Sequence, residues 1–255
     1  MTAALALLAA LLAAPPSCDD PVPAYGRETA CEVRELTLPA RGSLAVVNDV
    51  SGGVTVAGWD RDEVSVRAVV RAYETDGRSP GALLAATRIE TDGAVRNVTD
   101  GAVRNVTEGG GWVEVRYEVR VPRATDLSVR TNNGALTVED VRGTLRLDTS
   151  NGPVRLARVG GDVEARTSNG DVTVTLGGAG WSGDGLRAST RNGDIRLVAP
   201  EGTDAVVEAA TRYGAIGERM PGFRPAAETS RLYLGAGGPT LALTTSYGDV
   251  RVVRS

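Results

Sequence analysis

Residues Val163–Val174 read VEARTSNGDVTV, two short alternating runs on either side of the tetrad Thr-Ser-Asn-Gly. Val163 and Ala165 alternate with charged residues before the tetrad Thr-Ser-Asn-Gly, and Val172 and Val174 alternate with polar residues after it. Alternation with period two predicts strands with one buried face. Asn-Gly predicts a bend between the two strands, because both residues tolerate positive φ.

The same tetrad, in Asn and Tyr variants, recurs through the second half of the chain. Its glycines are separated by 18, 18, 23, 21 and 34 residues, so the basic unit has about 18 residues and later units carry insertions. An aliphatic residue follows two positions after every one of these glycines. The turn and ladder positions that we predict are Thr131, Asn133, Gly134, Thr149, Asn151, Gly152, Thr167, Asn169, Gly170, Thr190, Asn192, Gly193, Thr211, Gly214, Thr245 and Gly248.

The phase of the repeat places each tetrad threonine on the buried face. Its methyl group is expected to pack inward while its hydroxyl bonds to backbone at the bend. Each unit also has a second glycine-rich corner about half a repeat away, such as Gly143 or Gly160-Gly161. Two corners per unit favour a coil over a meander of hairpins, each unit lying over the previous one at about 4.8 Å. We therefore predict an all-β, single-stranded parallel β-solenoid.

Outward positions agree with this stacking. Arg130, Asp148 and Arg166 precede the threonine in successive units and would stack as alternating charges. Each exposed pair contributes under about 1 kcal/mol, but all favour the same register.

The N-terminal part shows a weaker form of the same repeat pattern. Val47-Asn48 followed by Gly52-Gly53 is typical of a divergent first turn, and 64–72 and 112–121 alternate as long strands that could pair. The octad at 91–98 is repeated without change at 99–106, which indicates a tolerant surface segment. This β-sheet region is expected to cap the solenoid. The predicted organisation is a signal peptide at 1–17, a flexible N-terminal segment at 18–35, an N-terminal β region at 36–121 and solenoid repeats at 122–255.

The N-terminus indicates export. The run AALALLAALLAA at 3–14 has the size of a signal-peptide core but lacks a preceding basic region, and it is too short to span a bilayer. Cys18 and Cys31 are the only cysteines. One disulfide pinning the mature N-terminus is the favoured interpretation, and lipidation of Cys18 is the alternative.

Composition excludes several classes of function. The 28 basic residues are all arginine, and the net charge of −4 offers no basic face for nucleic acid. The chain has no histidine, so nucleophiles activated by histidine are excluded. We predict no cofactor and no metal.

The repeats resemble the bacterial putative-adhesin family of β-strand-repeat proteins, a domain of unknown function. The resemblance covers about Leu36 to Val253 and rests on 119–122 (VRVP), 127–134 (LSVRTNNG) and the SNGDV core at 168–172. It implies a single-stranded β-solenoid, export and an adhesin-like role, with no catalytic residue to carry over. The insertions before Thr190 and after Gly214, together with tyrosine in place of asparagine in the last two tetrads, depart from the regular repeat.

A few side chains have a functional interpretation beside a structural one. Asp171, Asp194 and Asp249 follow corner glycines and could form a cation or acid site, although local turn stabilisation is favoured, since other units carry non-acidic residues there. Trp181, Tyr213 and Tyr247 are possible surface contacts for a sugar or partner, with packing the favoured role for each.

We therefore expect an exported, non-catalytic, adhesin-like protein that presents a rigid surface to an envelope protein or glycan. A carbohydrate-active β-helix enzyme is the alternative, and it would need two or three carboxylates converging on one face. Self-association through an open C-terminal edge near 250–253 is a third hypothesis.

Overall fold

The structure of the protein is a computed structural model that describes residues 17–19, 29–74, 79–92, 102–107, 112–178, 181–218 and 229–254. The predicted signal peptide therefore lies outside the described residues except for Ser17. Over these described residues, twenty strands and one short helix make an all-β fold, which confirms the predicted class.

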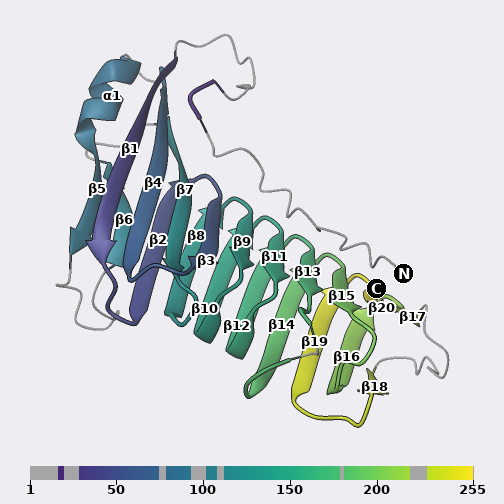
Figure 1. The fold of residues 1–255 in the computed structure, drawn as a ribbon. Coiled ribbons are helices and arrows are strands. Elements are labelled where there is room, and N and C mark those ends of the chain that lie inside the picture. Colours follow the sequence, from purple (N-terminus) through teal and green to yellow (C-terminus); the bar gives the residue numbers. More distant parts are fainter. Residues whose placement is uncertain are drawn as a thin grey trace, which may run out of the picture.

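The described strands form one continuous hydrogen-bonded sheet that folds at the Thr-x-Asn/Tyr-Gly corners into two faces, here called sheet 1 and sheet 2 (Figure 1). Sheet 1 has the spatial order β5 (Thr87–Asp92), β6 (Ala102–Thr107), β2 (Ser43–Ser51), β8 (Asp126–Asn133), β10 (Arg142–Asn151), β12 (Gly160–Asn169), β14 (Gly185–Asn192), β19 (Thr240–Tyr247), β16 (Ala205–Tyr213) and β18 (Thr229–Leu234). Sheet 2 has the order β1 (Thr29–Pro39), β4 (Glu63–Tyr73), β7 (Trp112–Pro122), β3 (Val54–Trp59), β9 (Leu136–Glu139), β11 (Val154–Ala157), β13 (Val172–Thr175), β15 (Ile195–Ala199), β20 (Val250–Arg254) and β17 (Ile216–Glu218).

Each turn of the solenoid, here called a rung, contributes one strand to each sheet. Neighbouring rungs pair in parallel and in register, so that Leu145 lies between Leu127 and Val163, and Thr149 between Thr131 and Thr167. The predicted column of Arg130, Asp148 and Arg166 is present in the same register. In spatial order the rungs are β2–β3, β8–β9, β10–β11, β12–β13, β14–β15, β19–β20 and β16–β17.

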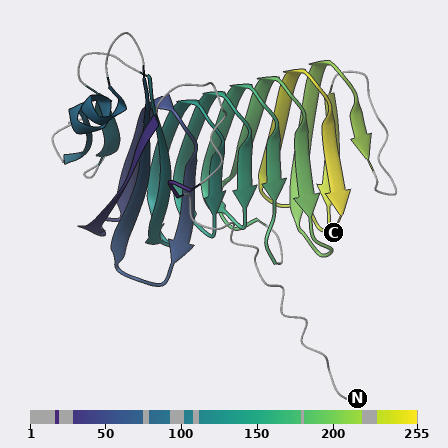
Figure 2. The same cartoon turned by 90° about the horizontal axis from the view of Figure 1, so that it is seen from above.

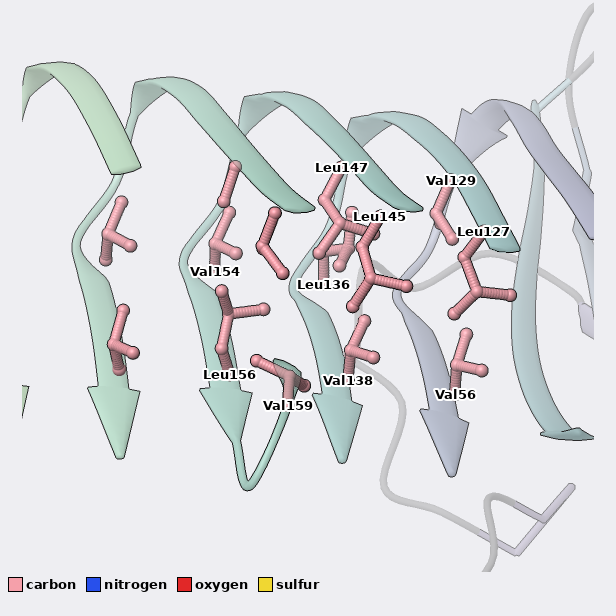
Figure 3. Packing of buried hydrophobic residues seen from close by; sticks show 14 of the residues in the cluster. Val56, Leu127, Val129, Leu136, Val138, Leu145, Leu147, Val154, Leu156 and Val159 are labelled. Carbon is pink, nitrogen blue, oxygen red and sulfur yellow. The ribbon is translucent and has the colours of Figure 1, made fainter. Parts of the chain in front are cut away.

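One continuous apolar core fills the space between the two sheets. Figure 3 shows Leu127, Val129, Leu145 and Leu147 of sheet 1 pointing toward the side chains of sheet 2. These residues come from the predicted inward phase, and Leu145 is fully buried. The stack of rungs therefore follows from the period-two pattern, because only one face of each strand is apolar.

A separate β region covers the N-terminal end of the stack. β4 pairs antiparallel with β7 from Ser65 to Tyr73, as the two long alternating runs predicted, and β1 continues that sheet. Helix α1 (Pro80–Ala86) begins at the N-cap Ser79 and buries Leu83 against the same end (Figures 1 and 2). Arg34 donates to the carbonyl oxygens of Leu84 (2.9 Å) and Thr87, so it satisfies groups at the helix C-terminus. This region is the cap that the sequence predicted.

The order of the last rungs differs from the prediction that every unit lies over the previous one. β19 pairs with β14 on one side and β16 on the other, and β20 pairs with β15 and β17. The yellow β19 accordingly lies between green neighbours in Figure 1 and Figure 2. The final unit is thus inserted between two rungs that precede it in sequence, after β18 has paired antiparallel with the far side of β16.

This insertion corrects the hypothesis of an open C-terminal edge. Residues 250–252 have parallel neighbours on both sides and Val253 pairs with β15, so β20 is an interior strand over 250–252. Among the described strands, β17 and β18 are the outermost at this end of the two sheets.

Two further expectations about the N-terminal part are corrected. Residues 29–35, within the segment expected to be flexible, belong to β1, because β1 pairs with β4 over eleven residues. The second copy of the octad, expected to be a surface segment, supplies 102–106 to β6, which pairs with β2 and β5. An insertion of eight residues is even, so it preserves which face of a strand is buried. Most of the first copy, 93–98, lies outside the described residues.

Candidate binding surfaces

The threonine of each tetrad fastens its rung to a neighbouring rung. Its side chain is buried, and its hydroxyl donates to the corner glycine carbonyl of the adjacent rung, as in Thr167 to Gly152 O at 3.0 Å and Thr190 to Gly170 O at 2.9 Å. The corresponding bonds of the other rungs start from Thr131, Thr149, Thr211 and Thr245. The hydroxyl therefore bonds to the neighbouring rung and not to its own bend.

We expect Thr167→Val to lower the free energy of unfolding by about 1 kcal/mol, because it keeps the buried methyl group but replaces the hydroxyl with a second methyl and leaves the Gly152 carbonyl without its bond. Urea unfolding followed by circular dichroism measures this. Thr173→Val is the matched control: Thr173 points outward from β13, and its change should stay within about 0.5 kcal/mol. Equal losses for both variants would contradict the assigned role of the hydroxyl.

The tetrad asparagines form an exposed amide ladder. The Nδ2 of Asn151 donates to Asn133 Oδ1 (2.8 Å), and Asn169 and Asn192 continue the series at 2.9 and 2.8 Å. Ladders of stacked amides arise naturally when identical positions lie one rung apart.

Tyr247 and Tyr213 occupy the asparagine position in the last two rungs. Their rings stack with centroids 4.9 Å apart and an interplanar angle of 16°. The guanidinium of Arg212 lies 5.3 Å from the centre of the Tyr213 ring. Tyr213 is 55% exposed and Tyr247 54%, but each ring covers a face of the other, so the tyrosines extend the ladder and offer mainly their edges to a ligand.

The three corner aspartates lie on consecutive rungs, because the last rung is inserted beside Asp194. The sequence had suggested that a non-acidic unit separates them. Asp194 Oδ1 accepts from Asp249 N at 2.8 Å, and Asp171 Oδ1 accepts from Asp194 N at 2.9 Å. Arg251 pairs with the second oxygens of Asp194 and Asp249. These carboxylates therefore join adjacent rungs instead of acting only within their own turns.

A cavity of about 650 Å³ lies at the opposite, glycine-rich corner. We call it the arginine groove. Its lining residues are Arg123, Ala124, Asp140, Arg142, Arg158, Val159, Gly177, Gly178, Trp181 and Ser182.

Backbone geometry at this corner directs the charged side chains. Asp140 and Arg158 occupy equivalent positions one repeat apart, and both have positive φ (57° and 53°). Arg158 binds Asp140 through two bonds of 2.8 and 2.7 Å, and Arg123 approaches the same carboxylate at 3.7 Å. Arg123 also binds Asp60 at 2.7 Å.

Trp181 forms one wall of the groove. Its indole is only 7% exposed and donates from Nε1 to Gly161 O at 3.2 Å. The backbone of the same loop binds the same glycine, since Gly161 N donates to Ser182 O at 2.7 Å. The side chain thus folds back over the corner, as favoured, while it also lines the groove.

The groove is rich in cationic groups. Three arginines and one carboxylate line it, and both oxygens of that carboxylate are engaged by Arg158. Among the described residues the Arg142 guanidinium makes no hydrogen bond and no ion pair, and it attracts the Asp140 carboxylate only at longer range. A ligand entering the groove would therefore meet guanidinium donors, which suit carboxylate, sulfate or phosphate groups.

The hydrogen bonds from Arg158 hold the pKa of Asp140 below its ordinary value, and burial opposes them. A depressed folded-state pKa stabilises the protein above the unfolded-state pKa, and this stabilisation is lost as the pH falls through the folded-state pKa. We expect the stability difference between wild type and Asp140→Asn to shrink as the pH falls below about 4. Asparagine suits the positive φ of this position.

Urea unfolding at a series of acidic pH values tests this expectation. Arg158→Gln should show the same pH trend, and adding it to Asp140→Asn should cause no further change in the pH trend. A difference between wild type and Asp140→Asn that stays constant with pH would contradict the pairing.

The groove residues Arg123, Asp140, Arg142 and Arg158 were missed in the sequence. One signal was present: Asp140 and Arg158 are separated by 18 residues, the basic repeat, which places them at equivalent positions of successive units. The second corners vary in length, however, and they carry no motif that aligns them.

The structure also bears on the predicted disulfide, on metal binding and on membrane-spanning helices. Cys18 and Cys31 form a disulfide, which joins residues 17–19 to β1. Among the described residues, no group of three or more His, Cys, Asp or Glu side chains is placed to hold a metal ion. No helix in the described ranges is long and apolar enough to cross a bilayer.

Comparison with known protein families gives a match that covers most of the chain. Residues 36–253 match the Toastrack DUF4097 family across both the cap and the solenoid. The chain belongs to the Toastrack DUF4097 family. This confirms the resemblance to a β-strand-repeat family of unknown function.

Solved structures similar to this Toastrack protein have low sequence identity to it. A "putative cell adhesion protein" from Clostridium sporogenes ATCC 15579 is 12% identical with a TM-score of 0.45, covering 89% of this chain and 100% of its own. A "putative adhesin" from Bacteroides fragilis NCTC 9343 is 11% identical with a TM-score of 0.37, covering 89% and 97%. A "putative lipid binding protein" from Parabacteroides distasonis ATCC 8503 is 9% identical with a TM-score of 0.34, covering 87% and 96%. No curated protein matches the chain.

Proposed function

We propose that this protein is an exported, non-catalytic, adhesin-like component of the bacterial envelope that binds an acidic glycan in the arginine groove. The groove carries the proposal, because it combines a cavity, an indole wall and arginines on a rigid stack. Ladders on both faces and threonine bonds at the corner fix the backbone, so little ordering is needed when a ligand binds.

Export is supported by two observations. The apolar run at 3–14 has the length of a signal-peptide core. The Cys18–Cys31 disulfide suits an oxidising compartment. An envelope polysaccharide that carries uronic acid, sulfate or phosphate groups would meet the groove in that compartment.

Arg142 is the residue to change first, because its guanidinium makes no hydrogen bond or ion pair with the described residues and is therefore available to a ligand. We expect Arg142→Gln to weaken binding of acidic glycans about tenfold, the equivalent of one charge-assisted hydrogen bond. A glycan array followed by titration of the best ligand measures the effect. Binding should also weaken as ionic strength rises.

Arg146→Gln is the matched control. Arg146 is an exposed arginine on the outer face of β10, so its loss removes the same charge outside the groove. Binding of neutral glycans alone, binding of a protein partner that is insensitive to Arg142→Gln, or an equal loss with Arg146→Gln would overturn the proposal.

A further inference from the structure

The rung β19–β20 occupies a slot whose four walls are formed by earlier parts of the chain. β14 and β16 flank it in sheet 1, and β15 and β17 flank it in sheet 2. The link from β15 to β16, Pro200–Asp204, thus skips one rung position and leaves a gap about two strand spacings wide, or about 9.6 Å. Without the last unit, four strand edges would face one another unpaired.

The inserted unit fits the slot through both its buried side chains and its corner hydrogen bonds. Leu241, Leu243, Val250 and Val252 are fully buried in it. Thr245 donates to Gly193 O at 2.9 Å on one side, and on the other side Gly248 O accepts from Thr211 at 2.8 Å.

Backbone and carboxylate bonds complete the match on both sides. Gly193 N donates to Tyr247 O at 2.9 Å, and Val250 N donates to Ala215 O at 3.0 Å. Asp249 also accepts from Ala215 N at 2.9 Å while its own N–H donates to Asp194.

The connection that delivers the unit crosses over β16. β18 pairs with one edge of β16 and β19 with the other, and only Gly235–Pro239 joins them. Three of these five residues are glycines with positive φ, and Pro239 O accepts from Val206 N at 3.0 Å. If this short connection adopted an extended path, β19–β20 could leave its own slot while β18 stayed in place. The unit could then enter the slot of a second copy.

We propose that β19–β20 is an exchangeable rung, and that two copies of this chain form a dimer by inserting it into each other's slots. Each copy carries both slot and unit, so the exchange is reciprocal and closes as a twofold dimer. The contacts within each slot are the same as in the monomer, so the exchange changes only the path of Gly235–Pro239.

A thiol-pair experiment on the full chain tests this. Ser189 and Thr244 are register neighbours across β14 and β19, at a spacing that a disulfide can bridge. One copy carries Ser189→Cys and the other Thr244→Cys. The two are unfolded together in urea, refolded at increasing protein concentration without reductant so that Cys18–Cys31 stays closed, and then oxidised.

The expected result is a covalent heterodimer whose yield rises with protein concentration. Arg130→Cys mixed with Thr244→Cys should give none, since these positions lie four rungs apart. The single chain with both Ser189→Cys and Thr244→Cys should close its bond internally at low concentration.

Two outcomes of the thiol experiment would overturn the proposal. Internal closure without any heterodimer at high concentration would show that the unit enters only its own slot. Failure of internal closure would show that β19 does not lie beside β14. Deleting Gly237 and Gly238 shortens the connection, and a folded variant that stays monomeric would also contradict the exchange. None of these readouts depends on the proposed glycan binding.

Discussion

Replacing Gly193 by alanine should lower the free energy of unfolding by about 3 kcal/mol or more, a cost at the upper end of overpacking. A Cβ on Gly193 would lie 2.2 Å from the carbonyl oxygen of Gly170 on the neighbouring rung and 2.6 Å from its carbonyl carbon. Both atoms are backbone, so no side-chain rotation relieves the contact. The rungs would have to separate, and the bond from Thr190 to the same carbonyl would weaken.

Gly217→Ala is the matched control for this variant. Gly217 lies in β17 of the rung β16–β17, and an added Cβ would meet nothing within 4 Å. Its substitution should change stability by no more than about 0.5 kcal/mol. Chemical denaturation of both variants measures the difference. A Gly193→Ala protein as stable as Gly217→Ala would mean that the corners do not stack as closely as the structure shows.

Truncating Leu145 to alanine is expected to cost about 2–5 kcal/mol, the range for large buried side chains. Leu145 is fully buried between Leu127 and Val163 of adjacent rungs. Arg146→Ala, one position along the same strand, removes a larger side chain from the outward face and should cost little.

Amide hydrogen exchange adds a spatial readout to the Leu145 variant. Each rung contacts only its neighbours, so protection should fall first in β8, β10 and β12, while the distant cap strand β4 changes least. Similar stability losses for Leu145→Ala and Arg146→Ala, or a loss of protection spread evenly along the stack, would contradict the inward phase and the rung-by-rung packing.

The repeated part of the fold could be predicted because one local pattern determines it. Period-two alternation on both sides of Asn-Gly fixes which side chains point inward, and the 18-residue period of the first units fixes the register. The threonine position followed from the same phase. The acceptor of the threonine hydroxyl could not be predicted in this way, because a bond to the neighbouring rung exists only after the rungs have stacked.

The order of the last rungs could not be derived from the pattern. Every unit carries the same alternation, so the unit at 240–254 fits beside any other unit equally well in sequence terms. The 34-residue interval before Gly248 and the pair Tyr213 and Tyr247 were the available signals. The interval contains β18, and the tyrosines stack because the inserted rung brings them together.

Spin-label distances along one outward column test the central claim, the in-register stack with its inserted rung, most directly. Labels at Arg130 and Thr244 lie four rungs apart, or about 19 Å along the backbone, and labels at Arg130 and Ala210 lie five rungs apart, or about 24 Å. Electron double resonance on the monomer should therefore give the shorter distance for Thr244. A shorter distance for Ala210 would show that the units stack in sequence order, and distances unrelated to rung number would show that the chain is not a solenoid.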